Sequence, residues 1–194
     1  MGMGYLLAGM AIFFGVHSTA IVAPGWRDQM AARLGPIGWK ALYGVVSIVG
    51  FVLMVKGYNL TRGEPVPLYV PPTALRHIAA IVMLPVFPLL LATYLPGAIK
   101  RGVKHPMLTA TKLWALAHLL ANGNLGDVLL FGGFLVWAIA DRISLKRRQP
   151  GGPQTLPAGR FNDLIAVVAG FALYVLFVAW AHARLFGVAP MAAG

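Results

Sequence analysis

Hydrophobic residues along this chain gather into long runs that are separated by short polar links. A bilayer core about 30 Å thick is crossed by roughly 20 apolar residues in a helix. Runs near that length predict about six transmembrane helices, at 3–23, 38–58, 72–95, 107–121, 125–140 and 162–186. The predicted fold class is therefore all-α, a polytopic transmembrane helix bundle that forms a single domain over residues 1–194.

Two of these runs and one link depart from the simple pattern. The third run contains Pro85 and Pro88, which remove intrahelical hydrogen bonds and predict a kink. The fourth run is short and holds Lys112, so a tilted or re-entrant segment is an alternative to a full crossing. The link RQPGGPQTLPAGR at 148–160 has no hydrophobic period and is expected to be mobile.

Composition favours a membrane protein over a soluble or disordered one. Hydrophobic residues make up 59% of the chain and charged residues only 11%, with a mean hydropathy of +0.76. The absence of cysteine from the sequence excludes disulfides, cysteine-ligated iron–sulfur clusters and the covalent attachment of c-type haem. Any haem would have to be held non-covalently.

The formal charge of +11 is explained by membrane topology rather than by a nucleic-acid partner. Twelve of the sixteen Lys and Arg residues fall on the first, third and fifth links and their flanking helix ends. The positive-inside rule therefore places those links, including the one near Gly151, in the cytoplasm and both termini outside. The first run has no basic segment before it, because the first charge is Arg27, so we interpret it as a retained span and not a signal peptide.

Two of the five histidines fall deep within apolar runs. His17 shares a helix face with Phe13 and Phe14, and His118 shares one with Trp114 and several small residues. Ionisable residues at membrane depth mark functional sites by default. Aromatic rings beside small side chains suit a flat apolar ligand.

The depths of these two histidines agree if the helix of His118 enters the hydrocarbon core near Lys112, and differ by ~6 Å if it enters at Met107. Each histidine alone also fits an interhelical hydrogen bond. Two at matched depth on different helices favour bis-imidazole ligation of a haem, although spacing alone does not separate haem from another metal.

A basic corner and a second pair of histidines complete the candidate chemistry. Lys100, Arg101, Lys104 and His105 precede a helix start at Pro106, where the helix dipole favours an anion such as a haem propionate. The alternative is a cytoplasmic loop with snorkelling side chains. His77 and His182 lie near the outer ends of their runs and would form a competing metal or quinone pair if they faced one another.

The stretches GVHSTA at 15–20 and IKRGVKHPMLTATKLWALAHLLANGN at 99–124, together with Asp141-Arg142, resemble the NnrU family of bacterial membrane proteins. That family is similar to zeta-carotene isomerase, a membrane enzyme that carries haem b on two histidines. The resemblance implies a bacterial inner-membrane protein linked to denitrification and nitric oxide metabolism. It also implies axial ligation of haem b by His17 and His118. The isomerase has a Cys where this chain has Ala115, so the resemblance supports haem binding more than isomerisation.

Four functions are carried forward from the sequence. The first is a haem-b protein that serves nitrogen-oxide metabolism as an accessory, sensor or electron-transfer factor in the lipid bilayer, with a nitrogen oxide or a lipophilic molecule as its ligand. The second is a haem-dependent carotenoid or isoprenoid isomerase. The third is a membrane methyltransferase, because such enzymes also have a basic-His-Pro motif at a helix start. They need an acidic, Gly-rich cofactor region, whereas the tail after Arg160 has Asp163 as its one acid. The fourth is a cofactor-free scaffold. Gly/Ala spacing allows contacts between copies as well as internal packing.

Overall fold

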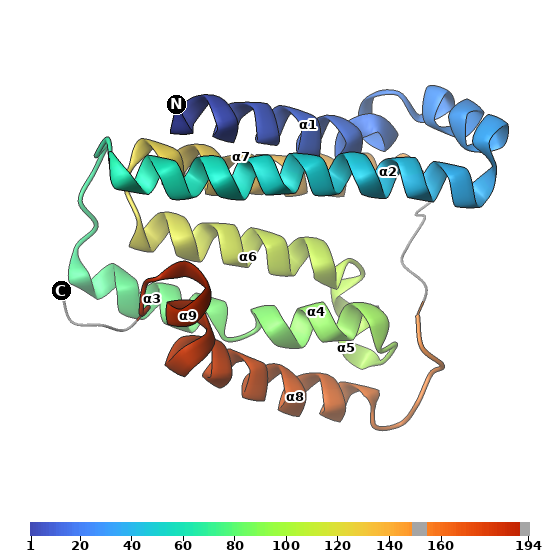
Figure 1. Ribbon diagram of the computed structural model, residues 1–194. Helices are drawn as coiled ribbons and strands as arrows, with labels where there is room; N and C mark the ends of the chain where they lie inside the picture. Colours follow the sequence, from blue (N-terminus) through green and yellow to red (C-terminus); the bar gives the residue numbers. More distant parts are fainter. Residues whose placement is uncertain (149–154, 191–194) are drawn as a thin grey trace. The chain divides into compact units, whose positions relative to one another are not determined.

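The computed structural model describes residues 1–148 and 155–190, and helices make up most of these ranges (Figure 1). The predicted all-α class is confirmed. Residues 149–154, which include Gly151 and six of the thirteen residues of the Pro/Gly-rich link, lie outside the described residues, so the mobility predicted for the link stays a prediction.

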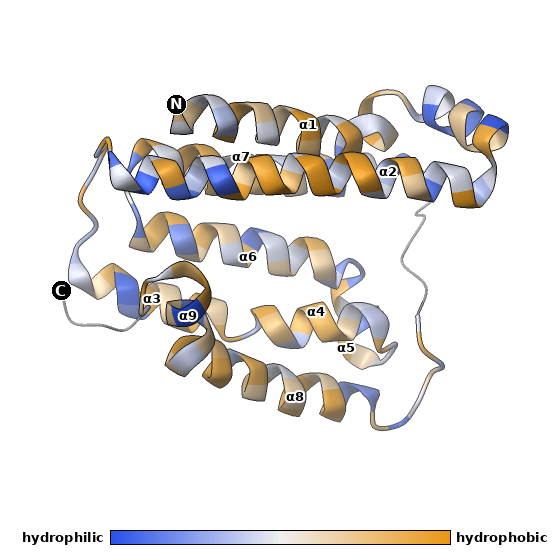
Figure 2. Ribbon diagram, viewed as in Figure 1, coloured by the Kyte–Doolittle hydropathy of each residue, from blue (hydrophilic) through white to orange (hydrophobic). Residues whose placement is uncertain are grey.

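Four stretches of the described residues are long and apolar enough to cross a membrane: Gly2–Val22, Pro24–Gly63, Thr73–Tyr94 and Asn162–Phe186. Figure 2 shows hydrophobic residues along most of these helices. The other two predicted runs form α6 (Pro106–Ala121) and α7 (Leu125–Ser144). Helix α6 is short, with 16 residues, and α7 carries charged side chains at both ends.

Two compact units divide the chain, and the first contains Met1–Tyr69 and Gly123–Ser144. Its helices are α1 (Gly2–Val22), α2 (Pro24–Gly63) and α7. Helices α1 and α2 pack closely because Gly9 and Gly57 leave no room for a side chain between them: a Cβ at either would collide with the backbone of the opposite helix. The fully buried side chains Leu6 and Met54 fill this interface.

The link predicted between the first two runs is itself helical. Helix α2 begins at Pro24, directly after α1, and bends at Gly35, whose φ of 71° lies in the left-handed region that favours glycine. Pro36 follows the bend and starts the long straight part of α2. The polar residues of the link therefore sit on a short helix, which is visible before the bend in Figure 2.

Helix α7 runs parallel to α1 and antiparallel to α2. A Cβ at Gly2 would meet Leu60, and one at Gly126 would meet Thr61, so the starts of α1 and α7 lie beside the end of α2. The segment after α2 is tied to the same end, because the Leu68 and Tyr69 amides donate to the Gly123 carbonyl. Residues 64–69 and the turn at Gly123 therefore lie at one end of the first unit.

The second unit contains Val70–Asn122 and the described part of Leu145–Gly194. Its first run is split into α3 (Thr73–Met83) and α4 (Val86–Tyr94) with Pro85 at the break, which confirms the predicted kink. The short helix α5 (Ala98–Val103) leads into α6.

The last run of the second unit contains α8 (Asn162–Leu176), a π-helical turn, η1 (Phe177–Ala181), and α9 (His182–Phe186). Helix α8 packs on α4, where Gly170 lies against the backbone of Pro88. The Tyr174 hydroxyl donates to the Ala80 carbonyl and fastens α8 to α3. The predicted span of 162–186 is thus continuous, but it is not a regular α-helix throughout.

Candidate functional site

His17 is half-buried in the first unit, and its tautomer is fixed by its own helix. Its Nδ1 lies 2.8 Å from the Phe13 carbonyl oxygen, one turn earlier. A carbonyl can only accept, so Nδ1 carries the proton and the lone pair of the neutral ring is on Nε2. Metal-bound histidines commonly donate their other ring N–H to a backbone carbonyl in this way.

Aromatic side chains from three helices surround His17. The Phe13 ring stacks on it at 4.0 Å between centroids, and Tyr43 of α2 and Trp137 of α7 lie at 5.1 and 5.8 Å. Phe14, the other aromatic side chain predicted at this site, contacts Phe134 and Trp137 instead. The buried Trp137 Nε1–H has no hydrogen-bond partner among the described residues.

Tyr43 and Trp137 were missed by the sequence analysis. Both lie in apolar runs, but nothing local shows that they face His17, because that depends on how α2 and α7 pack against α1. The first unit therefore surrounds the predicted ligand with more aromatic surface than its own helix supplies.

His118 is part-buried in the second unit and repeats the local geometry of His17. Its Nδ1 lies 2.8 Å from the Trp114 carbonyl oxygen, so its Nδ1 also carries the proton. The Trp114 ring is 5.1 Å from the imidazole. Ala115, one of the small neighbours expected on this face, is fully buried one turn before His118.

His17 and His118 lie in different units, so their convergence on one iron stays a prediction. The helix bounds bear on the depth argument. Helix α6 begins at Pro106, as predicted, so Met107 and Lys112 are both helical, and His118 lies three residues before the end of α6 at Ala121. His17 lies five residues before the end of α1 at Val22.

Within the second unit, the structure brings His118 together with His182. Their ring centroids are 6.4 Å apart and the ring planes are inclined by 25°. The Nδ1 of His182 lies 2.6 Å from the Val188 carbonyl, so it too donates to a backbone oxygen. The sequence analysis considered a competing pair of His182 with His77 of α3. In the structure, the rings of His118 and Phe186 contact the His182 ring.

The residues of the predicted basic corner point in several directions. The Lys100 ammonium donates to the Thr93 carbonyl at the end of α4, at 2.6 Å. Lys104 is the hinge between α5 and α6, with a φ of 64° that is rare for a residue with a side chain, and His105 is the N-cap residue of α6. Arg101 lines a groove of about 330 Å³ with Pro96, Gly97, Ala158, Gly159, Arg160 and Asp163.

Asp163 already occupies the start of α5. Its carboxylate accepts hydrogen bonds from the amides of Ala98 and Ile99, at 2.7 and 3.0 Å. The sequence analysis noted this residue only as the one acid of the tail after Arg160, whereas in the structure it joins α8 to the basic corner. Its negative charge beside Arg101 reduces the attraction of this groove for an anion.

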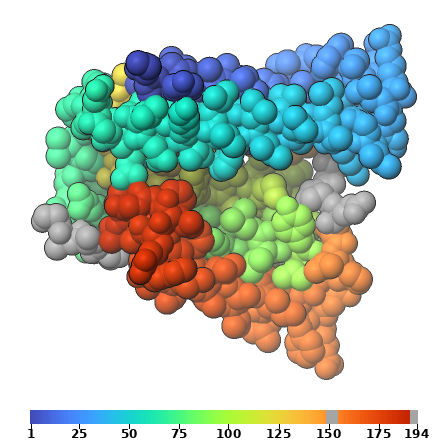
Figure 3. Space-filling view, viewed as in Figure 1, coloured from blue at the N-terminus to red at the C-terminus, as the bar shows by residue number. Residues whose placement is uncertain are grey.

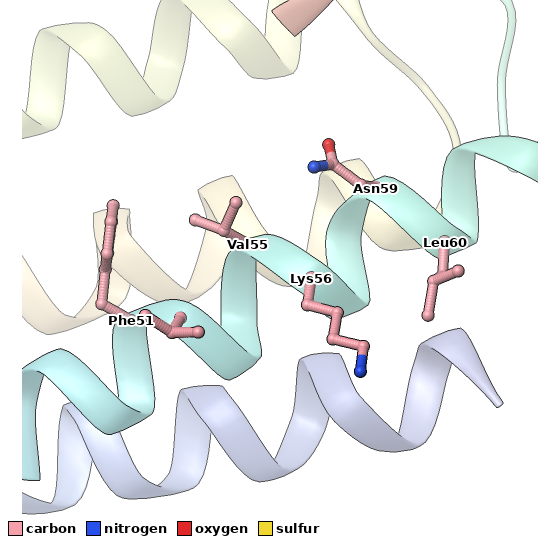
Figure 4. A pocket seen from close by; sticks show the side chains of 6 residues that line it. Phe51, Val55, Lys56, Asn59 and Leu60 are labelled. Atoms are coloured by element: carbon pink, nitrogen blue, oxygen red, sulfur yellow. The ribbon is translucent and has the colours of Figure 1, made fainter. Parts of the chain in front are cut away.

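A second hollow lies on the surface of α2, and His17 is not among the residues that line it. It is a shallow groove of about 460 Å³ with walls from one helix (Figure 4), formed by Phe51, Val52, Val55, Lys56, Asn59 and Leu60. Figure 3 shows this part of α2 on the molecular surface. The Lys56 ammonium lies 4.7 Å from the Tyr5 ring centroid. An apolar wall with a lysine near its end is typical of a lipid-facing surface.

A buried carboxylate at one end of the first unit was also missed. Asp127 is 4% exposed and accepts a 2.6 Å hydrogen bond from the Tyr58 hydroxyl. Its other oxygen accepts from the backbone and side-chain N–H groups of Asn124, as in a capping box at the start of α7. This arrangement joins α2 to α7 and has a structural role.

Among the described residues, no group of three or more His, Asp or Glu side chains is placed to hold a metal ion. Comparison with protein families finds a match to the family described as NnrU protein, over residues 5–190. Comparison with curated proteins and with solved structures finds no match.

Proposed function

Because the chain belongs to the NnrU protein family, we propose that it is a haem-b membrane protein that serves denitrification and nitric oxide metabolism in the bacterial inner membrane. The proposed cofactor is held non-covalently between two axial imidazoles. The pair proposed from the sequence is His17 and His118, with Phe13, Phe14 and Trp114 against the ring system.

The observation that carries this proposal is the shared tautomer of the two histidines. In each, Nδ1 donates to the carbonyl of an aromatic residue four positions earlier, at 2.8 Å. The helix thereby restrains the ring and leaves the lone pair on Nε2, the atom that would bind iron. The orphaned Trp137 N–H beside His17 supports a polar or charged group at that site, since buried donors are seldom left without a partner.

Bound haem b would supply a one-electron redox centre in the membrane. Two axial imidazoles leave no open position on the iron, so electron transfer fits this ligand set better than catalysis at the metal. The aromatic side chains around His17 would limit the access of water to its imidazole. We propose that Arg101 and Lys104 pair with the propionates.

The test is the absorption spectrum of protein purified from haem-replete cells. We expect a Soret band with low-spin α and β bands, and we expect His118→Ala to lose or convert the low-spin signal. His77→Ala, which changes a histidine near the end of α3 in the same unit, is the matched control and should keep the spectrum. Purified protein without a Soret band would refute the proposal.

A further inference from the structure

The short helix before the bend in α2, residues 24–34, is held at one membrane surface. Gly50 of α2 lies against Phe13 of α1, and Gly57, further along α2, lies against the earlier Leu6. The two helices are therefore antiparallel, and the end of α1 lies beside the beginning of the straight part of α2. Both helices are long and apolar enough to cross the bilayer. The segment 24–34 joins them, so it lies where the two crossings emerge from the membrane.

One face of this segment is apolar. Trp26, Met30 and Leu34 are spaced four residues apart, which places them within an arc of ~80° on a helix. Trp26 is 51% exposed and Leu34 is 44% exposed, so the described residues leave much of this face uncovered. The Trp26 ring also lies edge-on to Trp39 on the other side of the bend, with centroids 6.1 Å apart. This contact helps to hold the segment in its direction.

The charged side chains of the segment are sorted by sign around this apolar face. Arg27 and Arg33 lie ~20° beyond its two edges, whereas Asp28 lies ~160° from its centre. The Arg27 guanidinium pairs with Asp28 at 3.0 Å, but both side chains are partly exposed, and such a pair contributes little. An apolar stripe with a tryptophan and flanking arginines is typical of a helix that lies in the plane of a membrane interface.

We propose that residues 24–34 form an interfacial helix that binds the phosphate groups of anionic phospholipids, of the phosphatidylglycerol type, at the predicted cytoplasmic surface. The apolar face lies at the boundary of the acyl chains, and Arg27 and Arg33 bind phosphates on either side of it. The bilayer covers this face because two crossing helices hold the segment at its surface. The arginines favour anionic over zwitterionic lipid because they add positive charge at the headgroups. This inference is independent of the proposed haem function.

The absence of cysteine from the sequence allows one fluorophore to report on this face. The full chain with Met30→Cys, labelled with an environment-sensitive dye, is reconstituted into phosphatidylcholine vesicles. The vesicles contain equal small fractions of spin-labelled phosphatidylglycerol or spin-labelled phosphatidylcholine as the quencher. We expect the anionic quencher to be more effective by about threefold or more. A dye on Ala32→Cys, which lies on the opposite face, should be quenched much less by either lipid.

Charge substitutions in the Met30→Cys background test the role of the arginines. Replacing Arg27 and Arg33 together by Gln should remove the excess quenching by phosphatidylglycerol. Asp28→Asn should increase this excess, because it releases Arg27 from its ion pair. Replacing Lys146 and Arg147 together by Gln is the matched control, since it removes the same charge just after α7 and should keep the excess.

Equal quenching by the two lipids, or an excess that persists without the two arginines, overturns the inference. A dye at position 30 that neither lipid quenches overturns it as well. Aqueous iodide then shows what covers the face: quenching by iodide means that the face lies in water, and protection from iodide means that protein covers it. None of these outcomes affects the haem proposal, which is tested by the Soret band.

Discussion

Replacing Tyr58 by Phe tests whether the buried Asp127 carboxylate fastens α2 to α7. The hydroxyl and the carboxylate oxygen are 2.6 Å apart, which is typical of a charge-assisted O–H···O⁻ hydrogen bond. Asp127 is 4% exposed, so water has little access to replace the missing donor. Leaving a charged acceptor short of one partner costs about 1.5–3 kcal/mol of the free energy of unfolding.

The energy of the Tyr58–Asp127 hydrogen bond depends on the environment of its acceptor. Interhelical hydrogen bonds in membrane proteins average only about 0.6 kcal/mol, because the unfolded chain in the membrane also finds partners. We expect the higher range here because the acceptor is a carboxylate whose other oxygen already serves two donors of Asn124. Asp127 therefore cannot easily turn to replace the lost bond.

The assay is reversible unfolding in mixed detergent micelles, followed by circular dichroism. Tyr94→Phe is the matched control, since this tyrosine is 43% exposed and its loss should change the free energy of unfolding by no more than ~0.5 kcal/mol. A double-mutant cycle with Asp127→Asn should give a coupling energy of about 1 kcal/mol or more. If Tyr58→Phe unfolds like the control and the cycle shows no coupling, the assigned role of the Asp127 site is wrong.

Three further predictions concern topology, the basic corner and helix packing. A single cysteine in place of Thr155 should not react with an impermeant maleimide in intact cells and should react after lysis. Labelling from the periplasm would show that the predicted orientation is wrong. Replacing Arg101 and Lys104 together by Gln should speed haem loss by about tenfold or more while the low-spin spectrum persists. If the rate of haem loss is unchanged, these two residues serve only to orient the protein in the membrane. Gly57→Val should lower the free energy of unfolding by about 1–3 kcal/mol in the same assay, because a Cβ there meets the α1 backbone. Gly44→Val is the control, since a Cβ there meets open space. Equal effects of the two substitutions would contradict the packing argument.

The sequence predicts features of the fold that depend on local chemistry. Pro24 ends the first apolar run, and Pro85 splits the third, because proline lacks the N–H that a helix interior needs. Pro36 likewise accounts for the bend in α2, but the polar residues before this bend predicted a non-helical link, whereas they form a short helix. Composition and hydropathy do not distinguish a polar link from a polar helix.

The sequence predicts only those contacts of the candidate site that are made within a single helix. Phe13 and Trp114 lie one turn before their histidines, so helical periodicity places them correctly. Tyr43 and Trp137 reach His17 from other helices, and that depends on packing between segments distant in sequence. The approach of His182 to His118 depends on a π-helical turn, which a pattern based on a 3.6-residue period does not reveal.

The shared end of residues 64–69 and the Gly123 turn has a consequence for the bilayer itself. Helix α6 ends at Ala121, two residues before Gly123, so the chain comes back to this end through α6. Its 16 residues span ~24 Å, about 6 Å less than the hydrocarbon thickness. If α6 crosses the bilayer, as the sequence predicts, the lipid around it would have to thin by that amount, which would bring headgroups and water inward there. His118, three residues from the end of α6, then lies close to the aqueous boundary, and a small solute such as a nitrogen oxide would reach its surroundings without crossing the hydrocarbon.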